Sequence, residues 1–198
     1  MKFKLTLFAL ITISIQAYSQ SKNTISVQYG GNYDDVNIHG IIGDFGYQGE
    51  GGTTFSLNYE RYIIHSFSLE TGLMYTYDKL QMNTISAGAR FYNGDIKLFT
   101  VPLIGKYTFF RYFFIDAGLL ADFETNYTGP NGNVANSTAG KQSGIGYEFG
   151  FGGKYTFNHI TVFINPFAQD HAVNRFSTSQ SNFNLLNSGV KFGVGYSF

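Results

Sequence analysis

The chain has 198 residues, a length typical of one domain, and its 13 basic and 13 acidic residues balance to a formal net charge of zero. That balance, without a basic cluster, argues against nucleic acid as a partner, and the absence of cysteine excludes disulfides and a lipidated N-terminus. Aromatic residues, all Tyr and Phe, reach 18%, Gly is abundant at 24 and Pro scarce at 3, while the mean hydropathy is only −0.08.

The N-terminus has the features of a secretory signal peptide. Lys2 and Lys4 form a short positive segment, and the apolar run Leu5–Ile15 that follows is too short to span a bilayer. Ala17 and Ser19 then place small residues before a cleavage site. We therefore expect residues 1–19 to be a cleaved signal peptide and residues 20–198 to be the mature domain, rather than residues 1–19 forming a buried helix.

Eight segments of alternating apolar and polar residues follow, and each is predicted to be a strand with two different faces. They are Thr24–Tyr33, Thr53–Ile64, Phe67–Tyr77, Ile96–Phe109, Tyr112–Tyr127, Ser143–Phe157, Ile160–Asp170 and Leu185–Phe198. The weakly alternating stretch Thr84–Phe91 is interpreted as a hairpin extension and not as a ninth strand. An even number of antiparallel strands places both termini at the same end.

The connections between these segments alternate between short and long. Short turns are predicted around His65, around Arg111 and at Asn158-His159. The other connections are long and rich in Gly, Asn, Asp and Ser, and they cover residues 34–52, 78–95, 128–142 and 171–184. This asymmetry is typical of membrane barrels with tight periplasmic turns and long external loops. The predicted fold is all-β, an eight-stranded antiparallel transmembrane β-barrel.

Counting back from each short turn tests the pairing. Apolar residues then oppose apolar residues on one face of every hairpin, and a slip of one residue would mix the faces. The predicted pairs are Ile63–Phe67, Leu57–Leu73 and Glu60–Glu70, then Phe109–Phe113, Tyr107–Ile115, Leu103–Leu119 and Lys106–Asp116, then Phe157–Ile160, Tyr155–Val162 and Lys154–Phe163. A soluble sandwich or lipocalin-like barrel, with the aromatic residues inside and the charges outside, is the alternative.

The last strand favours the membrane. Val190, Phe192, Val194, Tyr196 and Phe198 share one face, opposite a face of Lys, Gly and Ser residues. This strand resembles the C-terminal strand of bacterial outer-membrane β-barrels, whose terminal Phe belongs to their assembly signal. The resemblance implies that Phe198 is recognised by the barrel-assembly machinery.

The stretch Thr100–Phe123, TVPLIGKYTFFRYFFIDAGLLADF, carries a more specific resemblance. It is similar to the central hairpin of small outer-membrane β-barrel domains, often called porin-family or PorT-like, in the residues Pro102, Leu103, Lys106, Tyr107, Ala117 and Gly118. The layout also resembles eight-stranded barrels of the OmpA/OmpX type. The resemblance implies the outer membrane of a Gram-negative bacterium, contact with its lipid, and no shared catalytic residues.

The inward-facing charges are the candidate site. They are Glu60, Glu70, Lys106, Asp116, Glu148, Lys154 and Lys191. An eight-stranded barrel is narrow enough to be filled by side chains, and buried charges need partners. We interpret these residues as a structural ionic network that plugs the lumen, in which Lys106 and Asp116 pair across the strands with Glu70 nearby. A gated polar path and a proton-transfer site are the alternatives.

Other motifs are weaker. The four histidines lack metal-ligand spacing, so we expect neither a metal nor a cofactor. Residues His171 to Asn174 faintly resemble a stretch of outer-membrane lipid A deacylases, but Val173 stands where the nucleophile belongs. Asp34-Asp35 and Asp44 offer carboxylates to a cation, although a solvated loop is the favoured interpretation.

The expected function is that of a monomeric, non-enzymatic structural or interaction barrel. Its partners would be an unknown surface ligand or protein at the four long loops. A small passive pore is the main alternative, and a lipid-modifying enzyme is a weaker one.

Overall fold

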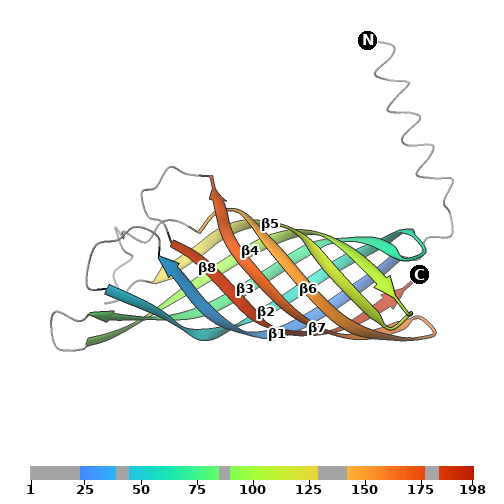
Figure 1. Cartoon of the computed structure of the whole chain (residues 1–198), viewed down its shortest axis with the longest axis horizontal. Helices are drawn as coiled ribbons and strands as arrows, with labels where there is room; N and C mark the ends of the chain where they lie inside the picture. The colour runs from blue at the N-terminus through green and yellow to red at the C-terminus, as the bar shows by residue number, and fades with distance from the viewer. Residues whose placement is uncertain (1–22, 39–44, 85–89, 129–141, 177–182) are drawn as a thin grey trace, which may run out of the picture.

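The chain forms a closed barrel of eight antiparallel strands (Figure 1). The computed structural model describes residues 23–38, 45–84, 90–128, 142–176 and 183–198. The strands are β1 (Asn23–Ile38), β2 (Phe45–Ile64), β3 (Phe67–Thr84), β4 (Arg90–Phe109), β5 (Phe113–Thr128), β6 (Gly144–Phe157), β7 (Ile160–Arg175) and β8 (Phe183–Ser197). Each strand pairs with its neighbours in the sequence, and β1 pairs with β8 to close the barrel. The predicted fold class is confirmed. Over these ranges no helix is long and apolar enough to cross a membrane.

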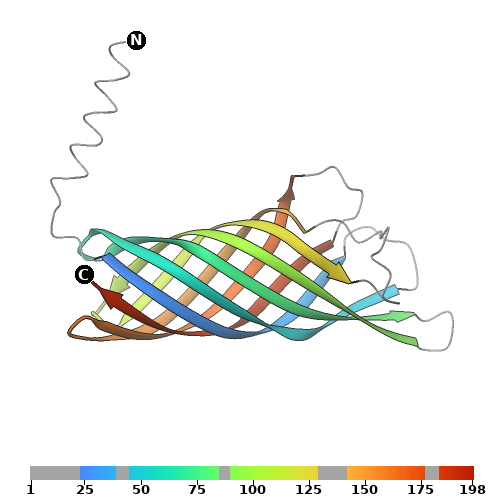
Figure 2. The same ribbon diagram turned by 180° about the vertical axis from the view of Figure 1, so that it is seen from behind.

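The three short turns and the C-terminus lie at one end of the barrel, here called the turn end (Figures 1 and 2). Phe110, Arg111 and Asn158 adopt positive φ angles of 49°, 66° and 53°, which reverse the chain within a few residues. At this end the backbone of Asn23 both donates to and accepts from Phe198, at 2.9 and 2.8 Å. The ends of the chain's first and last strands are therefore tied together.

The predicted register is confirmed at nearly every pair. Leu57 faces Leu73, Leu103 faces Leu119 and Tyr155 faces Val162, as predicted. The other predicted pairs of the second and third hairpins are also found. The pair of Ile63 with Phe67 is wrong, because Ile64 faces Phe67 instead. A register shift between Tyr62 and Ile64 inserts one extra residue into β2, as a β-bulge does.

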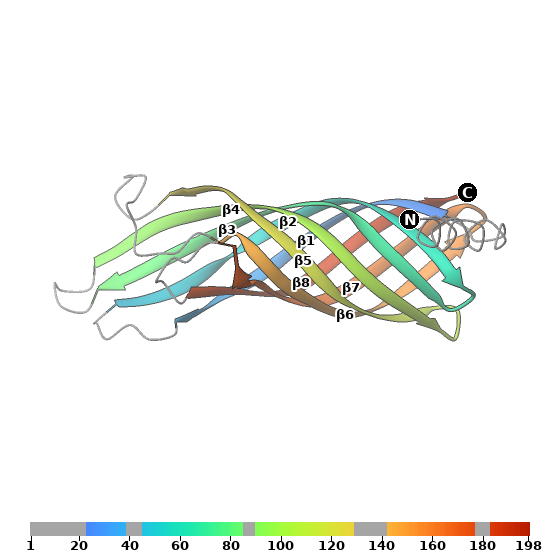
Figure 3. The ribbon, with the colours of Figure 1, turned by 90° about the horizontal axis from the view of Figure 1, so that it is seen from above.

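The strands run further toward the opposite end, the loop end, than the sequence predicts. Strand residues occupy 34–38 and 45–52, 78–84 and 90–95, and 171–175, all of which were predicted as loop. The hairpin extension predicted around Thr84–Phe91 is supported, since Thr84 pairs with Arg90. Of the predicted loop 128–142, residues 129–141 lie outside the described part of the chain, as does Asp44. Figure 3 shows that β2, β3 and β4 extend furthest at the loop end.

The strands extend further at the loop end than predicted because pairing with a neighbouring strand outweighs local sequence preference. The stretch around Gly49, Gly51 and Gly52 has weak strand propensity, and Gly51 has a φ of 92° next to a register shift. The neighbouring strand β3 nevertheless continues the ladder along this stretch as far as Phe45, whereas β1 pairs with β2 only as far as Gly52. Pairing with β3 satisfies backbone groups of this stretch despite the weak strand propensity of its glycines.

The two faces of the sheet are inverted relative to a soluble barrel. Large apolar side chains such as Leu103, Leu119, Phe149 and Phe192 are exposed on the outside, while Glu60, Glu70 and Lys191 are buried inside. The lumen also holds aromatic residues that the sequence pattern did not predict, including the buried Phe114 and Phe167. The soluble alternative is therefore wrong, because it requires the charges outside and the apolar face inside.

The apolar band on the exterior is shorter than the strands. On β1 the exposed Tyr33 is followed by the exposed Asp35, and on β3 Tyr77 is followed by the exposed Lys79. A tilted strand needs about 9–11 residues to cross a bilayer, whereas these strands have 14 to 20. The loop-end segments beyond Tyr33 and Tyr77 consequently stand outside the lipid-facing band.

Candidate functional site: a layered lumen

The inward side chains of three adjacent strands repeat one pattern along the barrel axis. A charged residue near the turn end is followed by an apolar residue and then by a polar or charged one. These are Glu70, Met74 and Asp78 on β3, Lys106, Ile104 and Thr100 on β4, and Asp116, Leu120 and Asp122 on β5. Met74, Ile104 and Leu120 are buried against one another as a single cluster. On this side of the lumen an apolar layer separates two polar layers.

The polar layer nearer the turn end, here called the inner polar layer, contains a lysine between two glutamates. The polar layer nearer the loop end is called the outer polar layer. Lys106 Nζ lies 2.6 Å from Glu70 Oε2 and 3.4 Å from Glu60 Oε2. Ser68 Oγ donates to Glu60 at 2.5 Å, and Asn58 Nδ2 donates to Glu70 at 3.0 Å. Each charge therefore has hydrogen-bonding partners, as burial requires.

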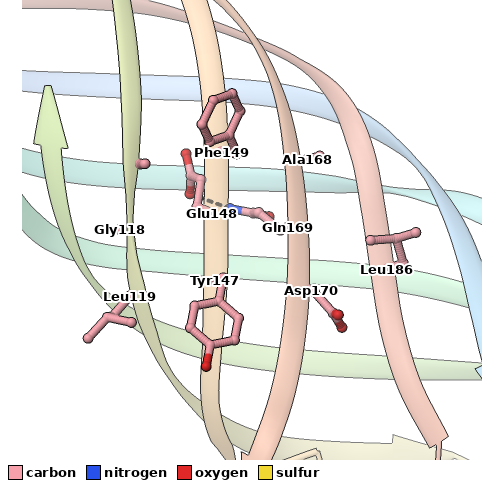
Figure 4. A pocket seen from close by; sticks show the side chains of 10 residues that line it. Gly118, Leu119, Tyr147, Glu148, Phe149, Ala168, Gln169, Asp170 and Leu186 are labelled. Atoms are coloured by element: carbon pink, nitrogen blue, oxygen red, sulfur yellow. Dashed lines mark hydrogen bonds between the residues drawn. The ribbon is translucent and has the colours of Figure 1, made fainter. Parts of the chain in front are cut away.

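A second ion pair lies on the other side of the lumen. Lys191 Nζ of β8 is 2.7 Å from Glu148 Oε1 of β6, and Gln169 Nε2 donates to Glu148 Oε2 at 2.7 Å (Figure 4). The Lys191 ammonium also lies 4.4 Å from the centre of the Phe167 ring, a cation–π contact. This group crosses from β6 through β7 to β8.

Two details of the predicted network are wrong. Lys106 and Asp116 are directly opposed, as predicted, but the ion pairs of Lys106 are with the glutamates, and Asp116 instead accepts from Asn165 Nδ2 at 2.8 Å. The Lys154 Nζ donates to two hydroxyl groups, Tyr62 and Thr108, both at 2.8 Å, rather than to a carboxylate. Lysine side chains are long enough to cross the narrow lumen, so strand pairing alone does not select their partners.

The sequence pattern missed the outer polar layer. His171, predicted in a loop, is fully buried in β7, and its Nδ1 lies 3.0 Å from Asp122 Oδ1. Thr100 Oγ1 donates to the same Asp122 oxygen at 2.7 Å, and the backbone N–H of Ala172 donates to the other at 3.0 Å. Ala172 has a φ of 50°, which turns its N–H inward. In the sequence, only the inward position of Asp122 in the alternating pattern of its strand indicates this layer.

Next to it lies a pair of carboxyl groups. Asp34 and Asp78, on β1 and β3, are both fully buried, and Asn32 Nδ2 donates to each, at 2.8 Å in the case of Asp78. Burial, and after it the neighbouring Asp78 charge, raises the pKa of Asp34 to about 8, and burial also raises the pKa of Asp78. Asp34 was predicted in a solvated loop, which is wrong because β1 continues to Ile38.

The wall of the barrel carries a hollow of about 540 Å³ that is lined by residues of β5, β6, β7 and β8. Figure 4 shows Leu119, Tyr147 and Phe149 around it, with Glu148 and Gln169 joined by a hydrogen bond. Leu119, Tyr147 and Phe149 belong to the exposed outer face. Most of this lining is therefore on the exterior of the barrel, while Glu148 and Gln169 belong to the lumen.

The closed eight-stranded sheet, apolar outside and polar within, defines a small transmembrane β-barrel of the outer-membrane type. No family model and no curated protein matches the chain. Among solved structures, the outer-membrane protein OprG of Pseudomonas aeruginosa aligns with a TM-score of 0.52 at 15% identity, over 90% of this chain and 96% of OprG.

Two further solved structures align more loosely. The attachment invasion locus protein Ail of Yersinia pestis, crystallised with the heparin analogue sucrose octasulfate, gives a TM-score of 0.48 at 13% identity, over 89% of this chain and 99% of Ail. The outer-membrane protease OmpT of Escherichia coli gives 0.41 at 9% identity, over 91% of this chain and 98% of OmpT. At these identities the likeness concerns the fold, which does not determine function.

Proposed function

We propose that this protein is an integral outer-membrane barrel of a Gram-negative bacterium that acts as a structural or interaction protein without enzymatic activity. The observation that carries this proposal is the apolar layer of Met74, Ile104 and Leu120 between two polar layers. An ion that crosses this side of the lumen would lose its hydration there without gaining a partner. The paired charges on either side plug the barrel rather than line a path.

The loop end is where such a barrel would meet its partners. β2, β3 and β4 extend furthest at the loop end (Figure 3), which supports contact with a surface ligand or protein in that region. The apolar exterior supports contact with outer-membrane lipid, and the aromatic C-terminus supports recognition by the barrel-assembly machinery. A monomer suffices for this role because the closed sheet leaves no unpaired edge.

A passive pore is the second candidate, and a specific observation favours it. Asp116 Oδ1, Asn165 Oδ1 and Gln169 Oε1 are buried without a hydrogen-bond partner in the described part of the chain. Buried polar atoms of this kind are usually satisfied by water, so these atoms of β5 and β7 favour a hydrated path through the lumen. A lipid-modifying enzyme is not favoured, because Val173 provides no nucleophile.

Single-channel recording of the refolded protein in planar bilayers tests the proposal. We expect no steady conductance from the unmodified protein, and an increase when Ile104→Ser and Leu120→Ser are combined, because the apolar layer is then removed. Leu119→Ser, on the outer face of β5 next to Leu120, is the matched control, and the barrel with this change should remain closed. Steady conductance of the unmodified protein would favour the pore.

Export requires the signal peptide to be removed, and residues 1–19 lie outside the described part of the chain. We predict that the mature chain begins at Gln20. Intact-mass measurement of the protein extracted from membranes checks this, and a mass that still includes Met1–Ser19 would contradict the proposed export.

A further inference from the structure

We propose that Asp34, Asp78, Asn32 and Asn187 form a binding site for a divalent cation, with Ca²⁺ as the best fit, at the loop end of the lumen. The residues come from β1, β3 and β8, so the site joins three strands across the barrel. Carboxylate and carboxamide oxygens are the ligands that Ca²⁺ takes in proteins.

The side chains converge on one small volume. Asn32 Nδ2 contacts the carboxyl groups of both Asp34 and Asp78, and Asn187 Nδ2 lies 3.1 Å from Asp78 Oδ2. Asp34, Asp78 and Asn187 have no exposed surface, and Asn32 retains 8%. A Cβ atom at Gly52 would collide with the Asp78 carboxylate, so the glycine leaves room for that carboxylate. The cluster is enclosed by the barrel wall.

The two carboxyl groups lack a basic partner. Within the described ranges, neither Asp34 nor Asp78 forms an ion pair with lysine or arginine. The positive charge of His171 on β7 favours the ionised form of Asp78 and opposes the rise in its pKa, but the His171 Nδ1 is bonded to Asp122 and not to Asp78. From β2 the closest residues are Gly49 and Gly52, which carry no charge. Two buried carboxylates require a positive counter-charge, which is either a proton or a cation.

Two carboxamide oxygens of the cluster support the binding of a cation. Asn32 Oδ1 and Asn187 Oδ1 are buried and have no hydrogen-bond partner among the residues that the structure describes. A half-turn of each carboxamide exchanges its oxygen for its nitrogen and directs that oxygen toward the carboxylates. Asp34 and Asp78 would then supply the charge, Asn32 and Asn187 two neutral oxygens, and water the remaining ligands of a six- to eight-coordinate ion.

This ligand set also sets the choice of ion. Across the described residues no group of three or more His, Cys, Asp or Glu side chains suits a metal, so the site depends on the two carboxamides. Ligands made only of oxygen disfavour soft transition metals. Mg²⁺ demands near-ideal octahedral geometry at shorter distances, which side chains from three separate strands are less able to provide.

Calorimetric titration of CaCl₂ into the chelator-treated mature protein in lipid nanodiscs tests the site. We expect saturable binding of one Ca²⁺ at pH 8, an affinity for Mg²⁺ at least tenfold lower, and an increase in melting temperature on adding Ca²⁺. Asp34→Asn and Asp78→Asn should each weaken Ca²⁺ binding at least tenfold. Asp35→Asn, which removes the same charge from the exposed face of β1, is the matched control and should bind as the unmodified protein does.

Both variants replace a carboxyl group by an amide of the same shape, and the heat-dependent gel shift of folded barrels reports whether each one folds. Folded protein that takes up no Ca²⁺ would overturn the proposal. Binding that is equal in the unmodified protein, Asp34→Asn and Asp78→Asn would also overturn it and would assign the ion to the lipid headgroups.

Discussion

At the scale of single residues, Lys106 shows how the lumen selects partners. Its directly opposed residue on β5 is Asp116, yet its ammonium group lies between Glu70 of β3 and Glu60 of β2. The Phe114 ring of β5 lies 5.1 Å from the same ammonium group. Glutamates on two strands thus compensate one lysine, and the aspartate depends on Asn165.

Double-mutant cycles measure how strongly Lys106 is coupled to each carboxylate. We predict that Lys106→Met alone costs about 3–5 kcal/mol, because it leaves buried carboxylates without a counter-charge. Combining it with Glu70→Leu should cost less than the sum of the two single changes. The matched cycle of Lys106→Met with Asp116→Leu should show the weaker coupling. Urea unfolding in lipid vesicles gives the free energies, and stronger coupling to Asp116 than to Glu70 would contradict the assignment.

At the scale of the strand, the two faces of β5 are adapted to different surroundings. Leu119 is 47% exposed on the outer face near the middle of the strand, while its neighbour Leu120 is fully buried in the lumen. Asn126, further along β5, lies beyond the last large apolar residue of that face, Phe123. The strand therefore provides a deep and a shallow position with outward side chains.

Arginine substitutions at these two positions test the lipid-facing assignment. Leu119→Arg should destabilise the barrel by about 2–4 kcal/mol, the cost of a cation near the bilayer midplane, whereas Asn126→Arg should cost about 0–1 kcal/mol. Folding titrations in bilayers measure both values. Equal costs at the two positions would show that Leu119 does not face lipid.

At the scale of the whole molecule, the seam between β1 and β8 closes the barrel and contains the C-terminus. Phe198, which directly follows β8, bonds to Asn23 through its backbone, and it is 58% exposed, the same fraction as Phe192 within β8. The exposed rings of Phe198 and Phe192 therefore form a matched pair for testing the proposed assembly role of Phe198.

Replacing each of these phenylalanines separates assembly from stability. We predict that Phe198→Ala lowers the amount of barrel inserted in the outer membrane of cells while the purified protein still refolds in detergent. Phe192→Ala, which removes an equally exposed ring, should insert better than Phe198→Ala. Quantitative immunoblots of membrane fractions provide the measurement, and equal insertion of the two variants would argue against an assembly role for Phe198.

The sequence by itself was sufficient to predict the eight strands, their order and nearly all of the hairpin register. Side chains alternate with a period of two, and each short turn aligns the residues that follow it, so pairs such as Leu57 with Leu73 depend only on local counting. Strand ends at the loop end were not predictable in this way. There, pairing with β3 keeps the Gly-rich start of β2 in the sheet despite its weak local strand propensity.

Only the tertiary structure decided which inward side chains meet. Asn187 and Asp78 are 109 positions apart, and Lys106 reaches a glutamate two strands away. These contacts cross the lumen, so they depend on the tilt and stagger of the closed sheet, which no single hairpin specifies. Alternation thus determined which residues face inward, and closure of the barrel determined the partners they find there.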